Sequence, residues 1–137
     1  MNESPASANN GLVNVNSIYS VSDTANRLEK IVTEKGMKVF ARIDHAKGAK
    51  SIDKELRPTE LIIFGNPMSG TPLMQSAQSV AIDLPMKALV WEDADRQVWL
   101  TYNDANYLTE RHDVKGCDEV IAKIGNALAN FAKAATT

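Results

Sequence analysis

The chain has 137 residues, a formal net charge of −2 from 15 Lys and Arg against 17 Asp and Glu, and 44% hydrophobic residues. This ordinary globular composition excludes collagen-like and wholly disordered chains, and a single cysteine, Cys117, excludes an internal disulfide. The near-neutral charge argues against a nucleic-acid partner, and no apolar run approaches the roughly 20 residues that span a bilayer. The length predicts one domain.

The first ten residues, MNESPASANN, are polar and contain no apolar stretch typical of a signal peptide. We expect residues 1–11 to form a flexible tail and residues 12–137 to form a single domain. The sequence as written fits a cytoplasmic protein, whereas removal of an export signal would place it in the periplasm or outside the cell. The compartment therefore stays open.

The first third of the domain predicts a strand, a helix and a second strand. Residues 12–19 alternate and are rich in β-branched side chains. Ser22 is expected to cap a helix that ends at Gly36, because serine caps helix starts and glycine follows helix ends. Residues 37–43 alternate again, which indicates a half-buried strand. One face of that strand is expected to carry Met37, Val39, Ala41 and Ile43.

The middle of the chain predicts two short helices around a central strand. Residues 45–54 are rich in Ala and Lys and indicate a short helix or turn. The continuous apolar run from Leu61 to Phe64 predicts a strand buried on both faces. Thr71 is expected to cap a short helix, with Pro72 at its first position.

The last third predicts a hairpin and two helices. Residues 86–92 and 97–102 are expected to be strands, joined by a turn at residues 93–96. Trp91 and Trp99 would then pair across the two strands. A short helix is expected near residues 104–110. The final helix is expected over residues 118–133, where apolar side chains recur at helical spacing.

This order of elements predicts an α+β domain. An open antiparallel sheet with the two long helices packed on one face would bury the apolar stripe of each helix. A doubly wound parallel sheet is the alternative. The adjacent strands of the hairpin at residues 86–102 count against it.

The segment from Gly65 to Thr71 has the spacing of a phosphate-binding loop, with two glycines followed by a hydroxyl residue. The lysine on which such a loop depends is missing, so we do not expect a nucleotide site. The plain interpretation is a tight turn fixed by Pro67. A third interpretation is that free backbone amides at residues 70–73 bind a small anion or a carboxylate.

Two histidines have acidic neighbours in sequence: His45 follows Asp44, and His112, which follows Arg111, precedes Asp113. A histidine oriented by a carboxylate can act as a general base. Because adjacent strand residues point to opposite faces, we expect the pairing to be with a distant group such as Asp83. A purely structural network is the alternative. The histidine spacing predicts no metal site.

Several strings of residues carry a family resemblance. They are Arg42–Ala46, Leu56–Leu61, Phe64–Pro67, Gly70–Met74, Ile82–Pro85, Val90–Asp93, Tyr102–Asn103 and Arg111–His112. Over about residues 12–133 the chain resembles the domain of unknown function 302 family of small bacterial proteins. The resemblance implies a curved antiparallel sheet with two helices packed on it, as in TATA-binding-protein-like architectures. It implies neither DNA binding nor any established catalytic residue.

Polar members of these strings lie at the ends of predicted elements and are the candidate site residues. They are Asp44, His45, Asn66, Gly70, Thr71, Asp83, Asn103, Arg111 and His112. We expect a pocket between the 65–72 turn and the group of His45, Arg111 and His112. The predicted function is binding of a small ligand, such as an anion or a carboxylate. The alternatives are a protein-interaction domain that forms a homodimer, and a histidine-dependent hydrolase or isomerase. The identity of any cofactor stays open.

Overall fold

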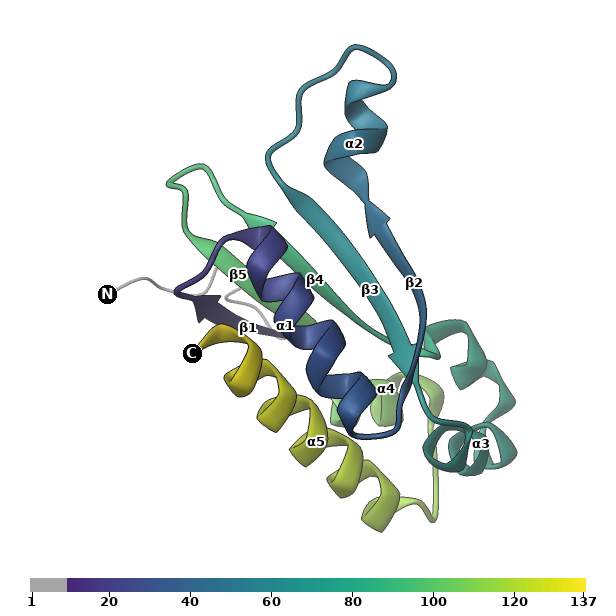
Figure 1. The fold of residues 1–137 in the computed structure, drawn as a ribbon. Helices are drawn as coiled ribbons and strands as arrows, with labels where there is room; N and C mark the ends of the chain where they lie inside the picture. The colour runs from purple at the N-terminus through teal and green to yellow at the C-terminus, as the bar shows by residue number, and fades with distance from the viewer. Residues whose placement is uncertain (1–9) are drawn as a thin grey trace.

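The computed structural model describes residues 10–137, so residues 1–9 of the expected tail lie outside the described part of the chain. Five strands and several helices form the predicted α+β fold (Figure 1). In chain order the elements are β1 (Leu12–Ser17), α1 (Val21–Glu34), β2 (Lys38–Asp44), α2 (His45–Lys50), β3 (Thr59–Gly65), α3 (Pro67–Ser76), the 3₁₀ helix η1 (Gln78–Asp83), β4 (Met86–Glu92), β5 (Val98–Asn103), α4 (Ala105–His112) and α5 (Asp118–Thr136).

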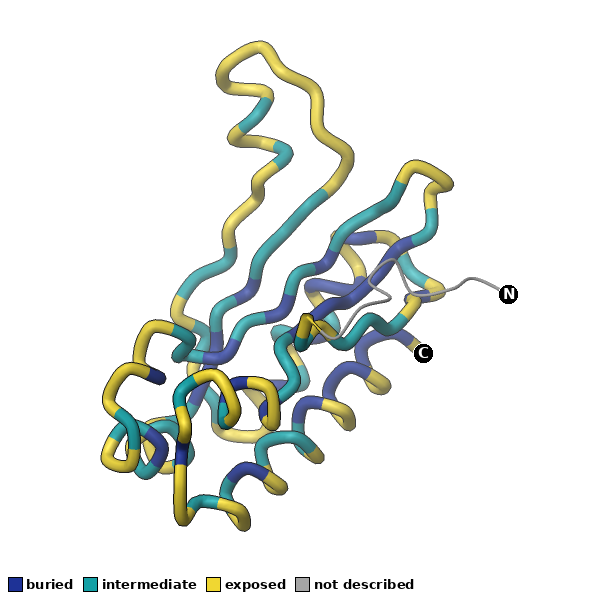
Figure 2. The backbone as a smooth tube through the Cα atoms, turned by 180° about the vertical axis from the view of Figure 1, so that it is seen from behind, coloured by how far each residue is buried: buried dark blue, intermediate teal, exposed yellow. Residues whose placement is uncertain are grey.

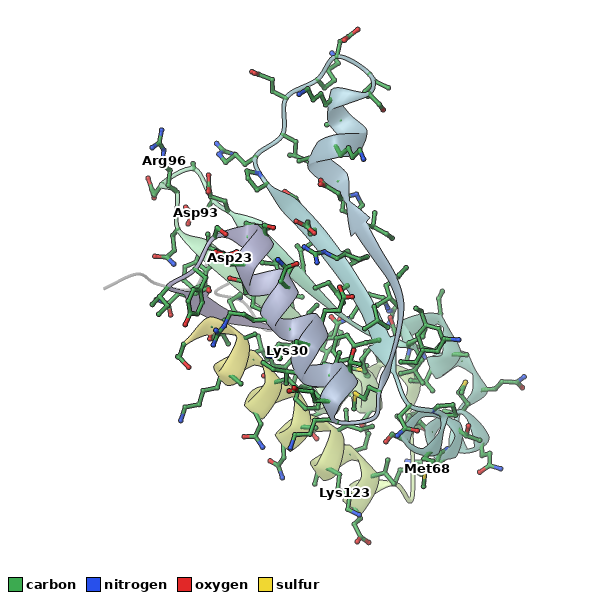
Figure 3. The ribbon with its side chains drawn as sticks, in the orientation of Figure 1. Asp23, Lys30, Met68, Asp93, Arg96 and Lys123 are labelled. Carbon is green, nitrogen blue, oxygen red and sulfur yellow. The ribbon has the colours of Figure 1, made fainter. Side chains whose placement is uncertain are left out.

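The sheet has the strand order β1-β5-β4-β3-β2, and every neighbouring pair is antiparallel. The doubly wound alternative is therefore wrong. The predicted β4–β5 hairpin is confirmed, with Trp91 opposite Trp99. Asp93 and Arg96 lie at its tip (Figure 3). Oδ2 of Asp93 accepts a hydrogen bond of 2.9 Å from the Trp99 indole nitrogen, which lowers the pKa of the Asp93 carboxyl.

The two long helices, α1 and α5, lie side by side on one face of the sheet (Figure 1). Each helix turns one apolar stripe toward the strands, as helical spacing predicts. The Phe64 ring of β3 meets the Phe131 ring of α5 edge to face, with centroids 6.5 Å apart. Fully buried side chains in this core include Leu28, Val32, Ile62, Phe64, Val90 and Leu100.

Helix α1 begins two residues earlier than expected. Its cap is Ser20, whose side chain accepts a 3.0 Å hydrogen bond from the Asp23 amide, so the expected cap at Ser22 is wrong. Both serines suit a cap, and the packing of the buried Val21 side chain favours the earlier start. The predicted end of the helix is confirmed: Gly36 follows it with φ of 81°, a backbone conformation that glycine adopts without strain.

Strand β2 contains a bulge that alternation alone did not predict. Val39 pairs with Phe64 and Arg42 pairs with Ile62, and the register shifts between Val39 and Ala41. The expected common face of Met37, Val39, Ala41 and Ile43 is therefore wrong. The extra residue of the bulge places the side chains that follow it on the opposite face of the sheet from the one that simple alternation predicts. Arg42 consequently points toward α1 and donates a 2.6 Å hydrogen bond to Glu60, which raises the pKa of Arg42.

Strand β3 is an internal strand of the sheet but is buried on one face only. Ile62 and Phe64 face the helices and are fully buried, whereas Leu61 and Ile63 on the other face are half-buried. The expectation of burial on both faces is wrong because α1 and α5 cover a single side. Beyond the helices, the connection from β2 through α2 to β3 extends from the body and is largely exposed (Figure 2).

Helix α3 begins at Pro67, five residues before the predicted first position. Asn66 is its cap, and Oδ1 of Asn66 accepts a 2.9 Å hydrogen bond from the Met68 amide. The expected cap at Thr71 is wrong, since Thr71 and Pro72 lie inside this helix. Asn66-Pro67 and Thr71-Pro72 are both a polar cap residue followed by proline, so the sequence contains the start signal twice. The chain uses the first.

Candidate functional site

A pocket of about 260 Å³ lies at the end of the sheet, where β3 leaves it and β4 enters it. Its walls come from α3, η1, α5 and the start of β2. The lining is mainly apolar and, among the described residues, contains no charged side chain. The lining residues are Met37, Phe40, Phe64, Gly65, Asn66, Pro67, Ser69, Gly70, Thr71, Met74, Ala81, Leu84, Pro85, Met86, Ile124, Ala127, Leu128 and Phe131.

Three polar side chains interrupt this apolar lining. They are those of Asn66, Ser69 and Thr71, at and after the cap of α3. The oxygen of the Asn66 amide group is used by the helix cap, which leaves the side-chain NH₂ as a donor. Within residues 10–137, neither that NH₂ group nor the two hydroxyl groups has a hydrogen-bond partner. A ligand in the pocket can therefore use these groups.

Gly70 keeps the pocket open where α3 faces η1. A Cβ atom at this position would lie 3.6 Å from Cδ1 of Leu84 and 3.8 Å from Cε of Met74, at ordinary contact distance. A larger side chain would extend into the space between these groups. The Gly70 amide itself donates to the Asn66 carbonyl at 3.2 Å, within the first turn of α3. The amides at residues 70–73 thus lie inside a helix instead of at its free start.

A second group of candidate residues forms a network between η1 and α4. Asp83 lies at the end of η1, and Arg111 and His112 lie in the last turn of α4. Nη1 of Arg111 is 3.1 Å from both carboxylate oxygens of Asp83, and Nε2 of His112 is 2.6 Å from Oδ2. Nδ1 of His112 is 2.8 Å from Oγ of Ser79. The expected pairing of distant charged groups is present here.

Ser79, His112 and Asp83 are the residue types of a nucleophile, its base and an orienting carboxylate. Other features of the network favour a structural brace. The His112 side chain is only 8% exposed, and the same Asp83 carboxylate also holds Arg111, so the network fastens α4 to η1. None of the four side chains lines the pocket. Sequence reasoning missed Ser79, because a lone serine in a short turn carries no signal.

Asp44 and His45 lie at the other end of the sheet from the pocket, and Asn103 belongs neither to the pocket lining nor to the Asp83 network. Oδ1 of Asp44 caps α2 by accepting from the Lys47 amide, and His45 is exposed in the first turn of that helix. Asp44 pairs with Glu60 at the start of β3, while the pocket lies at its end, roughly 17 Å away along the strand. Asn103 pairs with Leu12 at the β1 edge. A single concavity shared by His45, Arg111 and the 65–72 segment is therefore a wrong expectation.

The remaining pocket residues have the same sequence pattern as core positions. Ile124, Leu128 and Phe131 continue the apolar stripe of α5, and Met74 and Met86 belong to apolar runs. A stripe that lines a pocket and a stripe that packs against a strand have the same helical spacing. Three of these residues are Met37, Met74 and Met86, and methionine is common at adaptable binding surfaces. They are far apart in the sequence, so only the fold brings them together.

Comparison with known proteins identifies the family. Residues 13–131 match the family described as domain of unknown function DUF302. The chain belongs to this family. A crystal structure of an uncharacterized conserved DUF302 protein from Bacillus stearothermophilus has the same fold, with a TM-score of 0.82 and 16% sequence identity. That match covers 93% of this chain and 99% of the other. The family match over residues 13–131 confirms the resemblance expected from the sequence.

Curated relatives of this DUF302 chain are longer proteins. A Brucella suis biovar 1 protein named fluoride-specific ion channel FluC 1 is 48% identical over 113 residues, which are 82% of this chain and 44% of that protein. A Brucella abortus biovar 1 protein of the same name matches equally well over 42% of its length. The chain thus spans less than half of these relatives. Within residues 10–137, no helix is both long and apolar enough to cross a membrane.

Proposed function

We propose that this DUF302 chain binds a small, largely apolar ligand in the pocket between α3, η1 and α5. The observation that carries the proposal is a mainly apolar cavity of about 260 Å³ that ends in the unpaired polar groups of Asn66, Ser69 and Thr71. Ligand sites in proteins are typically apolar concavities with a few placed polar groups that fix orientation. Family-string residues from Gly65 to Met74 gather on one wall of this pocket.

The charge distribution favours an uncharged ligand over the anion or carboxylate expected from the sequence. An anion moved out of water into this lining would meet no cation among the described residues, and burial of an unpaired charge is costly. Arg111, a positively charged candidate residue, does not line the pocket, and its guanidinium group holds Asp83. Hydrogen-bond donors at the pocket wall suit a hydroxyl or carbonyl oxygen.

A cavity-filling variant tests the proposal. We expect 1-octanol or 2-naphthol to raise the melting temperature of the wild type, because a ligand that binds only the native state stabilises it. Gly70→Leu places a side chain in the pocket and should abolish the shift. Gly125→Leu is the matched control, since Gly125 lies in α5 with no atom within 4 Å of its Cβ position. The proposal would be overturned if neither compound raised the melting temperature of the wild type, or if both raised that of Gly70→Leu by the same amount as that of the wild type.

The curated relatives favour a second proposed role, as an accessory domain of a fluoride channel. The match to less than half of proteins named fluoride-specific ion channel suggests a unit that acts beside the membrane-embedded part. The test is to express this chain with the Brucella suis protein from which the matching region has been removed. Co-purification of the two chains in detergent supports the role, and independent elution contradicts it.

The homodimer alternative stays a prediction. Exposed apolar side chains on β2 and the segment beyond it could take part in a contact between copies: Phe40, Ile43, Ile52 and Leu56. Sedimentation equilibrium over a hundredfold range of concentration would test it. A mass that rises with concentration supports the dimer, and a constant monomer mass contradicts it.

A further inference from the structure

We infer that the ligand of this pocket is an uncharged bicyclic aromatic molecule that carries a single hydroxyl or carbonyl group. The inference rests on the proposed function and deepens it, because it assigns a chemical class to the same site. It is carried by three features of the pocket: its volume, the composition of its walls and the position of its polar groups.

The volume limits the size of the ligand. An engineered cavity of about 150 Å³ in another protein binds benzene, which has six carbon atoms. The pocket of this chain is about 260 Å³, roughly 1.7 times that volume. The same packing density gives a ligand of about ten non-hydrogen atoms. Two fused rings fill this space, whereas one ring leaves part of it empty.

The walls favour an aromatic ligand over a saturated one of equal size. Three methionines, Met37, Met74 and Met86, line the pocket, and their polarisable sulfur atoms make favourable contacts with ring edges. The rings of Phe64 and Phe131 already meet at an interplanar angle of 70°, in an edge-to-face pair. Both also line the pocket, so a bound ring can extend this arrangement.

The polar groups define one end of the ligand. The free NH₂ group of Asn66 and the hydroxyl groups of Ser69 and Thr71 all belong to the first turns of α3. The opposite walls, from α5 and β4, contribute apolar side chains. A molecule with one oxygen at the end of a fused ring satisfies both environments, because its oxygen accepts from Asn66 and its rings contact the apolar walls.

A pair of probes with the same skeleton separates the inference from the proposed function. Isothermal titration calorimetry is done with 2-naphthol and with decahydro-2-naphthol, which has the same carbon and oxygen skeleton without aromatic rings. We expect 2-naphthol to bind the wild type about tenfold more tightly, which corresponds to about 1.4 kcal/mol. The charged 2-naphthoate should bind more weakly than 2-naphthol. Gly70→Leu should bind none of the three, and Gly125→Leu should behave as the wild type.

The relative affinities of the three compounds separate the aromatic class, the uncharged class and the proposed function. Equal or tighter binding of decahydro-2-naphthol overturns the aromatic class and leaves the apolar pocket as a ligand site. Tighter binding of 2-naphthoate overturns the uncharged class. Absence of binding by all three compounds and by 1-octanol overturns the proposed function itself, and the inference with it.

Discussion

Nε2 of His112 lies 2.6 Å from Oδ2 of Asp83, and this contact joins the last turn of α4 to the end of η1. Replacement of His112 by Ala should lower the free energy of unfolding by about 1–3 kcal/mol, because it leaves a partly buried carboxylate with one partner fewer. Urea denaturation measures the change. Arg111→Ala should cost less than about 1 kcal/mol, since the Arg111 side chain is 52% exposed. An unchanged free energy in His112→Ala would rule out the brace.

Ser79→Ala separates the brace from a histidine-dependent hydrolase. As a structural member, Ser79 contributes a single hydrogen bond to Nδ1 of His112, so its loss should cost about 0.5–1.5 kcal/mol. We expect p-nitrophenyl acetate hydrolysis to be the same in the wild type and in Ser79→Ala. Hydrolysis by the wild type that Ser79→Ala and His112→Ala both abolish would instead support the catalytic alternative.

Gly70→Ala should stabilise the fold. Gly70 lies inside α3, and a Cβ atom there meets only side-chain atoms at ordinary contact distance. Alanine in a helix interior is favoured over glycine by about 0.5–1 kcal/mol, which chemical denaturation resolves. Gly125→Ala in α5 should gain a similar amount. Gly36→Ala should lose stability, because its φ of 81° disfavours any side chain. A loss in Gly70→Ala would show that this wall of the pocket has no room for a methyl group.

Asp93→Asn should change how stability depends on acid pH. The Trp99 indole donates to the Asp93 carboxylate and holds its pKa below the ordinary value of 3.8. The stabilisation is therefore complete above that value and is lost as the pH falls below it, through the lowered pKa. Melting temperatures should differ between wild type and Asp93→Asn by a constant amount at neutral pH. The difference should shrink below about pH 3.8. A constant difference down to pH 2 would contradict this account.

Local signals made most of the fold predictable. The hairpin at Asp93, the glycine after α1 and the stripe on α5 each depend on near neighbours in sequence, and all three are confirmed. The bulge at Phe40 could not be predicted in this way. The register of β2 after the bulge depends on its pairing with β3, which lies about 20 residues later in the sequence. This pairing places the Arg42 side chain on the face that α1 covers.

The candidate site was predictable in part for a related reason. Family strings directed attention to Asn66, Gly70 and Thr71, and these residues do line a pocket. The family strings could not show that His45 lies far from the pocket and from His112. That distance depends on which end of the sheet each histidine occupies, and only the fold decides this. The α5 residues that line the pocket could not be distinguished from core residues, because both have the same helical spacing.

The proposed apolar ligand occupies the space between α3, η1 and α5. Methionine methyl groups report on it directly by ¹³C NMR, since Met37, Met74 and Met86 line the pocket while Met68, on the outer side of α3, is 84% exposed (Figure 3). We predict that titration with 2-naphthol shifts the methyl signals of Met37, Met74 and Met86 together and leaves that of Met68 unchanged. Shifts confined to Met68, or no shift at saturating 2-naphthol and 1-octanol, would contradict the claim.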